Sequence, residues 1–496
     1  MKKAGCLMPV SSLPSLYGIG DFGSTAYEFI DILSAMGMKI WQVLPLNPLG
    51  FGNSPYQAYS SFAGDEIYIN IDKLVDICLL EANDIKPVNP QNKSVDYIKV
   101  RSHKQPLLQL AFTNFKKTNL YKDKYQQFIT SHHWLDDYAV FLTFKKINSL
   151  NLWTRWPDKY RNWPKNKQNK QLDLSKYAEQ IDYEKFIQFV FYWQWQELKV
   201  YANKHRIEIM GDIPIYLGLD SVDVWANQEL FLLDKSGNPT YIAGVPPDFF
   251  SATGQRWGNP LYDWDKLEKT GFKFWTQRLQ GNAKLFDILR IDHFRAFDTY
   301  WEIPAHCNTA IDGKWVEAPG YALFNTIYKK LPDIKIVAED LGDLRPEVYK
   351  LRDKYKLPGM KVFQFHFDIN KKNTEFENTS NMVIYTGTHD NTTLIAWYKT
   401  LSTVHRQQIR SYFKITSKGP NSISRDLKRA IISYILKCRA KYAIFPLQDI
   451  LGLNAFARLN TPGTIGSPNW EWRLLDYTTL KAEIDFMSQT IKSANR

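Results

Sequence analysis

Cysteine is scarce in this chain of 496 residues, and the four that occur lie far apart in the sequence. They form no C-x-x-C pair, and no histidine follows at zinc-ligand spacing; the four are Cys6, Cys78, Cys307 and Cys438. The spacing therefore indicates neither a disulfide framework nor a metal site. Cysteine usage of this kind is typical of a reducing compartment.

Long apolar runs are also missing. No stretch of about 18 apolar residues, the length of a membrane-spanning helix, occurs in the chain. The first residues, MKKAGCLMPVSSLPS, contain two lysines, but the apolar run before Pro9 is too short for a signal peptide. Internal repeats and low-complexity tracts are absent. We therefore expect a cytoplasmic protein with no membrane partner.

A dense basic segment is absent, although 63 Lys and Arg against 51 Asp and Glu give a net charge of +12. The lysines lie in short clusters on separate segments, FKKTNLYKDK, PKNKQNK, LYKKLPDIK and NKKNTEF. No nucleic-acid-binding motif accompanies them. The clusters favour a solvated surface over a nucleic-acid or acidic membrane partner.

Aromatic residues are abundant: 16 Trp, 28 Tyr and 29 Phe. An ordinary core explains most of them, but a surplus suits a protein that stacks on flat apolar faces such as those of sugar rings. A chain of this length with 44% hydrophobic residues can bury a large core. One large barrel with insertions, or two to three domains, would fit.

Short apolar runs recur along the chain, and most are followed by polar, Gly or acidic residues. The eight runs are GCLMPV, IWQVLPL, IEIMGDIPI, FDILRIDHF, IKIVAEDLG, MKVFQFHF, NMVIYTGTHD and YAIFPLQDILGL. Near-continuous apolar runs are typical of strands covered on both faces, as in parallel sheets. With helical patterns between them, they favour an α/β fold, a (β/α)8 TIM barrel, over the alternative of a doubly wound sheet.

Two helical patterns have recognisable starts. Residues 24–38 predict a helix in which Thr25 and Glu28 form a capping box. Residues 345–356 predict another, with Pro346 in its first turn.

Two connections, about 64–205 and about 217–284, are too long for simple crossovers. We expect large, mainly helical insertions on the C-terminal face of the barrel, where active sites lie. Residues 182–203 carry aromatics at the spacing of a helix packed by one face. Residues 244–264, rich in Gly, Pro and aromatics, predict either a lid or a long ordered surface turn.

Carboxylates occur where three of the predicted strands end. An unpaired charge within a buried strand costs free energy, so Glu339 and Asp340 in IVAEDLG are expected at the strand's exit. Arg290 and Asp292 in FDILRIDHF are two residues apart, which places both side chains on one face of a strand. Asp390 ends YTGTHD. Acids at the ends of parallel barrel strands converge on one mouth.

Converging carboxylates suit glycosidic chemistry, in which one carboxyl is protonated and another ionised. We expect the Arg290 guanidinium to lower the pKa of Asp292 and keep this residue ionised as a nucleophile. Three like charges raise the pKa of at least one acid, which fits Glu339 as a proton donor. A purely structural Arg290–Asp292 pair is the alternative, and Asp340 is expected to cap the following turn.

With these residues in view, the chain resembles the 4-α-glucanotransferases, the amylomaltase or disproportionating-enzyme branch of the α-amylase superfamily. The resemblance runs nearly end to end. It is carried by SSLPSLYGIGDFG, WQVLPLNPLGFGNSPYQAYSSFAG, GDIPIY, AGVPPDFFSATGQRWGNPLY, LRIDHFRAFDTYWEIPA, VAEDLG, LPGMKVFQF, YTGTHDNTT and ARLNTPGT followed by NWEWR. Each motif is weak alone, but their number and order make the signal strong.

The resemblance implies a retaining transfer of α-1,4-glucan segments, from a maltooligosaccharide donor to an acceptor glucose or glucan, without a cofactor. Asp292 matches the nucleophile, Glu339 the general acid and base, and Asp390 the residue that grips ring hydroxyls in the transition state. The nucleophile and the acid are expected about 5 Å apart. The resemblance further implies one catalytic barrel over residues 1–496, without a separate starch-binding domain.

Further substrate contacts are implied by the same resemblance. They are Tyr59 for stacking, Asp212, Arg290, His293 and His389 for hydrogen bonds to hydroxyl groups, Trp257 on a loop over the acceptor side, and Asn460. The chain departs from the family pattern at Asn53, His366 and Thr392. None of these departures removes a catalytic carboxylate, so they bear on chain-length preference and loop conformation.

Three other functions remain as alternatives. A hydrolase would use the same carboxylates with water as acceptor, and a non-catalytic glucan-binding barrel could keep the fold without the reaction. A metal-dependent lyase or an aldolase would need a His and acid ligand set or a strand-end lysine, and neither is evident.

Overall fold

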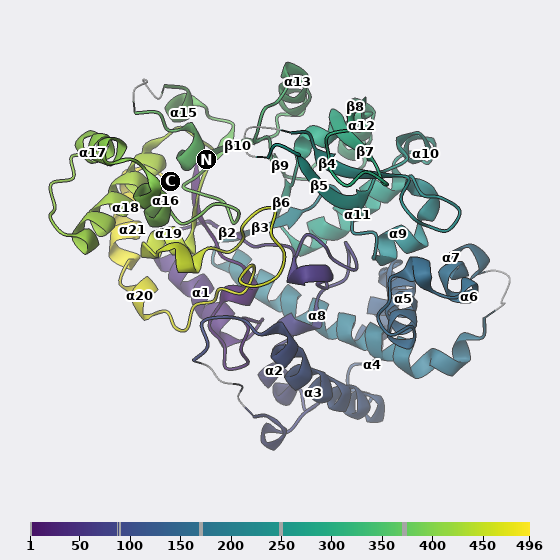
Figure 1. Ribbon diagram of the computed structural model, residues 1–496. Helices are drawn as coiled ribbons and strands as arrows, with labels where there is room; N and C mark the ends of the chain where they lie inside the picture. The colour runs from purple at the N-terminus through teal and green to yellow at the C-terminus, as the bar shows by residue number, and fades with distance from the viewer. Residues whose placement is uncertain (1, 87, 89–90, 168–171, 248–250, 370–373) are drawn as a thin grey trace.

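Eight parallel strands form a near-closed barrel at the centre of the molecule (Figure 1). The computed structural model describes residues 2–86, 88, 91–167, 172–247, 251–369 and 374–496. In spatial order the strands are β10 (Gly359–Val362), β11 (Met382–Tyr385), β12 (Tyr442–Pro446), β1 (Lys3–Leu7), β2 (Ile40–Gln42), β3 (Glu208–Ile213), β6 (Ile288–Ile291) and β9 (Ile336–Ala338). Each of the eight predicted runs contributes one strand.

The two end strands of this sheet meet and nearly close the barrel. The backbone N–H of Ala338 in β9 donates to the carbonyl oxygen of Pro358, just before β10, at 2.9 Å. Asp340 braces the same junction, because its carboxylate accepts from the N–H of Met360 at 2.6 Å and pairs with Arg352. The barrel prediction is confirmed and the doubly wound alternative is excluded. Asp340 is therefore a brace between neighbouring strands rather than a turn cap.

The connection between β2 and β3 is helical, as predicted for the first insertion. Its helices are α2 (Asp72–Asp76), α3 (Tyr97–Lys117), α4 (Lys122–Ser131), α5 (Leu135–Ile147), α6 (Asp158–Arg161), α7 (Trp163–Asn166) and α8 (Ala178–Lys204). The predicted helix over 182–203 lies within α8, which buries Phe186, Phe189 and Trp195. The blue helices of this connection extend to one side of the barrel (Figure 1).

The connection between β3 and β6 contains two strands that the sequence did not predict. It holds α9 (Val222–Ala226), β4 (Tyr241–Val245), β5 (Gln255–Pro260), α10 (Trp264–Lys269) and α11 (Lys273–Leu285). β4 and β5 join β7 (Thr299–Pro304) and β8 (Lys314–Glu317) in an antiparallel sheet of order β5-β4-β7-β8. The segment expected as a lid or surface turn thus contributes β5 to a sheet, while its residues 248–250 lie outside the described residues.

The remaining helices cover the barrel or connect its later strands. They are α1 (Ser24–Ala35), α12 (Gly320–Lys330), α13 (Pro346–Lys354), α14 (Phe363–His366), α15 (Thr374–Asn378), α16 (Leu394–Thr400), α17 (Thr403–Tyr412), α18 (Pro420–Lys437), α19 (Leu447–Leu451), α20 (Thr478–Lys481) and α21 (Ile484–Ser493). Within the described part of the chain, no helix is both long and apolar enough to cross a bilayer.

One predicted helix start is confirmed and the other is wrong. Pro346 occupies the first turn of α13 as predicted. The capping box is not formed, because α1 begins one residue before Thr25 and is preceded by Gly23. The Thr25 hydroxyl instead donates to the carbonyl oxygen of Pro14 at 2.7 Å, and Glu28 pairs with Lys481.

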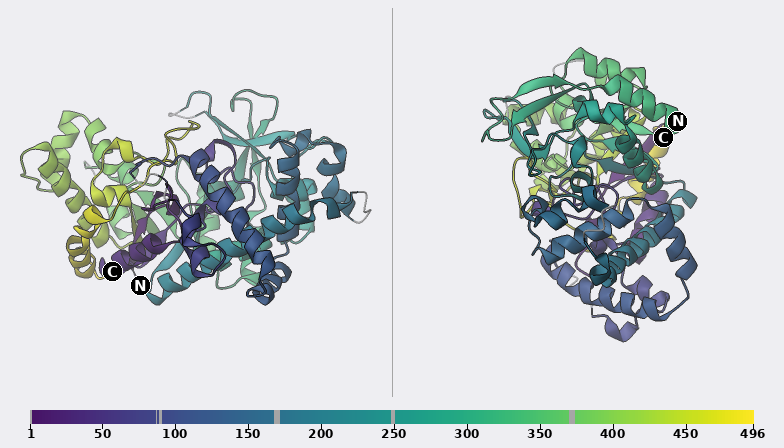
Figure 2. Two further views of the ribbon diagram at one scale, coloured as in Figure 1. Left: turned by 90° about the horizontal axis from the view of Figure 1, so that it is seen from below. Right: turned by 90° about the vertical axis from the view of Figure 1, so that its right-hand side faces the viewer.

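The two ends of the chain lie side by side at the amino ends of the barrel strands (Figure 2). The Arg496 guanidinium donates to the carbonyl oxygen of Ala440 at 2.9 Å, and that of Lys3 lies 3.4 Å away. The carboxyl ends of the strands, where the predicted acids lie, are at the opposite face.

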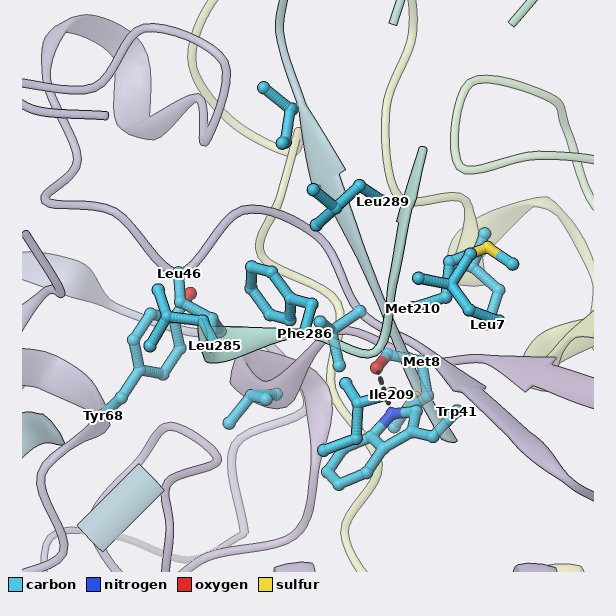
Figure 3. Close-up of a cluster of buried hydrophobic side chains, with 14 of the residues drawn as sticks. Leu7, Met8, Trp41, Leu46, Tyr68, Ile209, Met210, Leu285, Phe286 and Leu289 are labelled. Atoms are coloured by element: carbon cyan, nitrogen blue, oxygen red, sulfur yellow. Dashed lines mark hydrogen bonds between the residues drawn. The ribbon is translucent and has the colours of Figure 1, made fainter. Parts of the chain in front are cut away.

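Apolar side chains fill the space between the barrel wall and its helices (Figure 3). The indole N–H of Trp41 donates to the carbonyl oxygen of Met8 at 2.9 Å, so this large ring is buried without an unpaired donor. The ring of Phe286 packs directly on Gly211, where a Cβ atom would lie 2.2 Å from the ring. Position 211 therefore needs glycine, and the packing fixes β3 immediately before Asp212.

Candidate active site

A buried ion pair joins the ends of two neighbouring strands. The register places Asp212 of β3 opposite Arg290 of β6, and Nη1 of Arg290 lies 2.7 Å from both carboxylate oxygens of Asp212. The exposed fractions of the two side chains are 4% for Arg290 and 0% for Asp212. The other terminal nitrogen of Arg290, Nη2, lies 3.0 Å from Oδ1 of Asp292. Arg290 therefore holds two carboxylates at once.

Asp292 follows β6 and its side chain is 33% exposed, so it can reach a bound molecule. Burial raises the pKa of Asp292, and the Arg290 charge only partly offsets this effect. The negative charges of Asp212 and Asp390 raise the pKa further. The lowering by Arg290 that the sequence predicts is therefore present, but burial raises the pKa by more, so the net shift of Asp292 is upward. The charge of Arg290 still favours the ionised form and orients it.

Glu339 directly follows β9, and two backbone N–H groups fix its carboxyl group. The N–H of His293 donates to Oε2 at 2.8 Å, and the N–H of Leu341 donates to Oε1 at 2.9 Å. His293 adopts a left-handed backbone conformation with φ of 53°, in the turn after β6. Burial, followed by the charge of Asp292, raises the pKa of Glu339 to about 7. Near neutrality this acid is therefore partly protonated.

Asp390 follows β11 and lies on the same mouth, since its charge contributes to the raised pKa of Asp292. Its side chain is 42% exposed. Nδ2 of Asn460 donates to Oδ1 of Asp390 at 2.6 Å, and Arg458 donates to the Asp390 carbonyl oxygen at 2.7 Å. Asn460 thus orients Asp390 from a separate loop, a role in addition to any contact with substrate.

Tyr56 belongs to this network and was missed in the sequence. Its hydroxyl donates to Oδ2 of Asp212 at 2.8 Å and lies 2.9 Å from Nε2 of His389. Its ring stacks on that of His389, with the ring centres 5.2 Å apart and the planes 17° apart. Nε2 of His389 also lies 3.4 Å from Oδ2 of Asp390. Tyr56 therefore links the acids of β3 and β11.

Tyr59, the tyrosine expected to stack on substrate, makes different contacts. Its ring lies under Nζ of Lys145 in α5 at 5.0 Å, and its carbonyl oxygen accepts from the N–H of Val222 at 2.8 Å. Both tyrosines occur in SPYQAYSSF, and nothing in their spacing tells which one faces the acids. The hydrogen bonds to Asp212 and His389 connect Tyr56 to the acids.

His293 and Trp257 lie together beside Glu339. The ring of Trp257 in β5 meets the His293 ring edge to face, with centres 4.9 Å apart. Burial and the charge of Arg295 lower the pKa of His293 to about 3, so the ring is neutral at physiological pH. Tyr216 completes an aromatic group with these two rings. The sheet containing β5 thereby brings Trp257 to the barrel mouth.

Of the three expected departures from the family pattern, Asn53 and Thr392 lie in the connections after β2 and β11, and His366 is the last residue of α14. Asn53 has φ of 56°, a left-handed conformation that asparagine tolerates well. The Thr392 carbonyl oxygen accepts from Gln364 at 2.9 Å, and Nδ1 of His366 contacts the backbone of Val362. None of these contacts involves one of the three acids.

The acids of β6, β9 and β11 thus form one connected site with the Asp212–Arg290 pair. One carboxyl group has a pKa near neutrality, and a second is oriented by a guanidinium, which is the division of roles needed for acid-assisted nucleophilic displacement. Among the residues described, no group of three or more His, Cys, Asp or Glu side chains is arranged to hold a metal ion.

Comparison with known proteins agrees with this geometry. The profile of a family described as 4-alpha-glucanotransferase matches residues 8–479. A 4-alpha-glucanotransferase of Streptococcus pneumoniae is 41% identical over 485 residues, covering 96% of this chain and 94% of the relative. One from Thermus thermophilus is 42% identical over 481 residues, covering 95% and 94%.

A solved structure shows the same fold. It is the amylomaltase from Streptococcus agalactiae in complex with acarbose, which is 35% identical, covers 100% of both chains and has a TM-score of 0.93. With the family profile spanning most of the sequence and relatives above 40% identity over nearly all of it, the chain belongs to the 4-alpha-glucanotransferase family.

Proposed function

We propose that this protein transfers segments of α-1,4-glucan to the 4-OH of an acceptor glucose or glucan by a retaining double displacement. Asp292 attacks C1 of the donor glucose while Glu339 protonates the departing O4. The bond between C1 and O4 breaks as a bond between C1 and a carboxylate oxygen of Asp292 forms. Glu339, now ionised, accepts the proton of the acceptor 4-OH, which attacks C1 and releases Asp292.

The observation that carries this proposal is the difference in environment between the carboxyl groups of Glu339 and Asp292. Two backbone N–H groups hold Glu339 in place, and its pKa is raised to about 7. Arg290 lies 3.0 Å from Asp292 and favours its ionised form. A residue with a pKa near the working pH can both donate and accept the proton, as the two halves of the reaction require.

The surrounding residues supply binding to the sugar that reacts. Asp390, which is 42% exposed, would bind ring hydroxyls at the mouth. Asp212 and His389 are buried, and they hold Arg290 and Tyr56 in place beside it. We assign the stacking role to Tyr56 rather than Tyr59, because Tyr56 hydrogen bonds to Asp212 and stacks on His389. His293, neutral at physiological pH, and Trp257 would contact the acceptor side.

Transfer requires that a sugar rather than water reaches the covalent intermediate. Trp257, Tyr216 and His293 form an aromatic group beside Glu339, and aromatic rings stack on sugar faces. This group supports an acceptor-binding function and favours transfer over hydrolysis on the same carboxylates. Scarce cysteine further supports a cytoplasmic location, where maltooligosaccharides and storage glucans would be the substrates.

Incubation of the purified protein with maltotriose alone tests the proposal. A ladder of longer oligosaccharides together with glucose, resolved by chain length over time, is the expected result. Glucose and maltose alone, with reducing ends rising, would instead establish a hydrolase. No change across several acceptors would leave the non-catalytic binding protein as the better explanation.

Matched variants assign the reaction to the proposed residues. Glu339→Gln and Asp292→Asn should each lose most turnover but still bind maltooligosaccharide. Glu347→Gln and Asp353→Asn, which change two exposed acids of α13, should keep the wild-type rate. A wild-type rate for Glu339→Gln on maltotriose would refute the assigned role of Glu339.

A further inference from the structure

A buried carboxyl group outside the proposed catalytic set lies at the carboxyl end of β12. Asp449, in the first turn of α19, is 1% exposed. Its Oδ2 accepts a hydrogen bond from the Thr386 hydroxyl at 2.6 Å, and its Oδ1 accepts one from the backbone N–H of Leu394 at 2.7 Å. Both oxygens therefore contact the connection between β11 and α16.

These two contacts fall at the two ends of one loop. Thr386 is the first residue after β11, and Leu394 is the first residue of α16. Residues 386–393 between β11 and α16 contain His389 and Asp390. A single carboxylate thus fastens the start and the end of the loop that carries the proposed transition-state acid.

The loop itself is a tight turn stabilised by its own side chains. Oδ1 of Asn391 accepts from the N–H of Thr388 at 2.8 Å and from its hydroxyl at 2.9 Å. The N–H of Asp390 lies 3.3 Å from the Thr388 hydroxyl oxygen. Because the turn is internally held, a shift at its two ends would move His389 and Asp390 together.

Burial of the Asp449 carboxylate is costly, since the groups that hold it are neutral donors. A buried acid of this kind can hold backbone and side-chain donors at short, directed distances. Asp390 has further support from Asn460 and Arg458, which come from a different loop. Asp449 supports the loop differently, through hydrogen bonds to its first residue, Thr386, and to Leu394, which follows its last residue.

We infer that Asp449 is a positioning residue that sets the placement of Asp390 and His389 relative to Asp292. This inference rests on the proposed function, because it assumes that Asp390 acts in the transition state. Interactions made in the transition state are sensitive to small displacements, so loosening the loop should lower kcat more than it raises KM.

Three variants at the contacts between Asp449 and the loop distinguish a positioning role from a general effect on stability. Asp449→Ala removes both contacts and should lower kcat on maltotriose by at least tenfold, with KM changed less than threefold. Thr386→Val removes one contact with little change of shape and should lower kcat by a smaller factor. Asp449→Asn should rescue most of the rate, because its oxygen can accept from Leu394 N–H while its amide donates to the Thr386 oxygen. Asp21→Asn is the control for a change at a buried acid whose hydrogen bonds and ion pair are with Gly23, Asn70 and Lys104, outside residues 386–394, and it should keep kcat.

Amide hydrogen exchange gives a readout that does not depend on activity. Asp449→Ala should speed exchange within residues 386–394, above all at Leu394, and Asp21→Asn should not. If the wild type makes no ladder from maltotriose, the proposed function fails, yet exchange still reports whether Asp449 anchors the loop.

Three results would overturn the inference. The first is faster exchange at the loop with unchanged kcat, which would make the anchor irrelevant to catalysis. The second is lower kcat with unchanged exchange, which would place the effect elsewhere. The third is a wild-type kcat for Thr386→Val as a folded protein. This variant provides the test if Asp449→Ala does not fold.

Discussion

Replacement of Glu339 by glutamine should change how the stability of the protein depends on pH. In the folded state the pKa of Glu339 is about 7, whereas its ordinary value is 4.5. The folded state therefore binds this proton more tightly than the unfolded state. Between these two pH values the folded protein keeps a proton that the unfolded chain has lost, so the free energy of unfolding falls as pH rises.

The size of the effect follows from the same two pKa values. Their difference is about 2.5, and each pKa unit corresponds to about 1.4 kcal/mol, which gives about 3 kcal/mol. Glutamine does not titrate, so this loss is absent in Glu339→Gln. The variant should gain about 3 kcal/mol relative to the wild type between pH 4.5 and pH 8. Glutamine also loses one of the two backbone hydrogen bonds, and this loss lowers the free energy of unfolding equally at every pH. The predicted gain is therefore the change, from pH 4.5 to pH 8, in the difference between the unfolding free energies of the variant and the wild type.

Urea unfolding followed by tryptophan fluorescence, at several pH values from 4.5 to 8.5, measures both curves. Glu347→Gln is the control, since this exposed glutamate is not buried beside another acid. Its curve should stay parallel to that of the wild type. Parallel curves for Glu339→Gln as well would show that Glu339 has an ordinary pKa, which would refute the reasoning behind its role as the proton donor.

Three further outcomes follow from the same contacts. Tyr56→Phe should lower kcat/KM on maltotriose by about 10–100-fold, because it removes the hydroxyl that bonds to Asp212. Tyr59→Phe should lower kcat/KM less than about threefold. Equal effects of the two variants would reject the choice of Tyr56. The value of kcat/KM should increase with pH as Asp292 ionises and decrease above about pH 7 as Glu339 loses its proton. A value that keeps increasing to pH 9 would contradict the assignment of Glu339 as the proton donor. Phe286→Ala should reduce the free energy of unfolding by about 3–5 kcal/mol in urea titrations, since its ring packs on Gly211; a loss below about 1 kcal/mol would mean that the ring is not part of the core.

The barrel strands could be predicted from the sequence because parallel strands are covered on both faces and appear as apolar runs. The strands of the smaller sheet could not. β5 reads QRWGNP, in which Gly258 and Pro260 are poor strand residues, and it is stabilised by pairing with β4 instead. The missing capping box of α1 has a similar cause, since the Thr25 hydroxyl bonds to Pro14 in the preceding loop.

The acids of the site were visible in the sequence because they follow apolar runs, but their environment was not. The raised pKa of Asp292 depends on the partial burial of its side chain and on the acids that surround it, neither of which its spacing in the sequence reveals. The choice between Tyr56 and Tyr59 depends on which way a loop turns. Asp449 gave no signal, since its role depends on donors about 55 to 63 residues earlier in the chain.

The register of β1 has a consequence for the order in which the chain can fold. β1 pairs with β2 on one side and with β12 on the other, and Lys3 lies opposite Tyr442. At a synthesis rate of about 5–20 residues per second, the edge of β1 that faces β12 stays unpaired for roughly 20–90 s after it is made. β11 pairs with β10 along one edge, and its other edge stays unpaired until β12 is made. A nascent chain therefore exposes two strand edges late in synthesis, and these edges are where aggregation would start and where a chaperone would act.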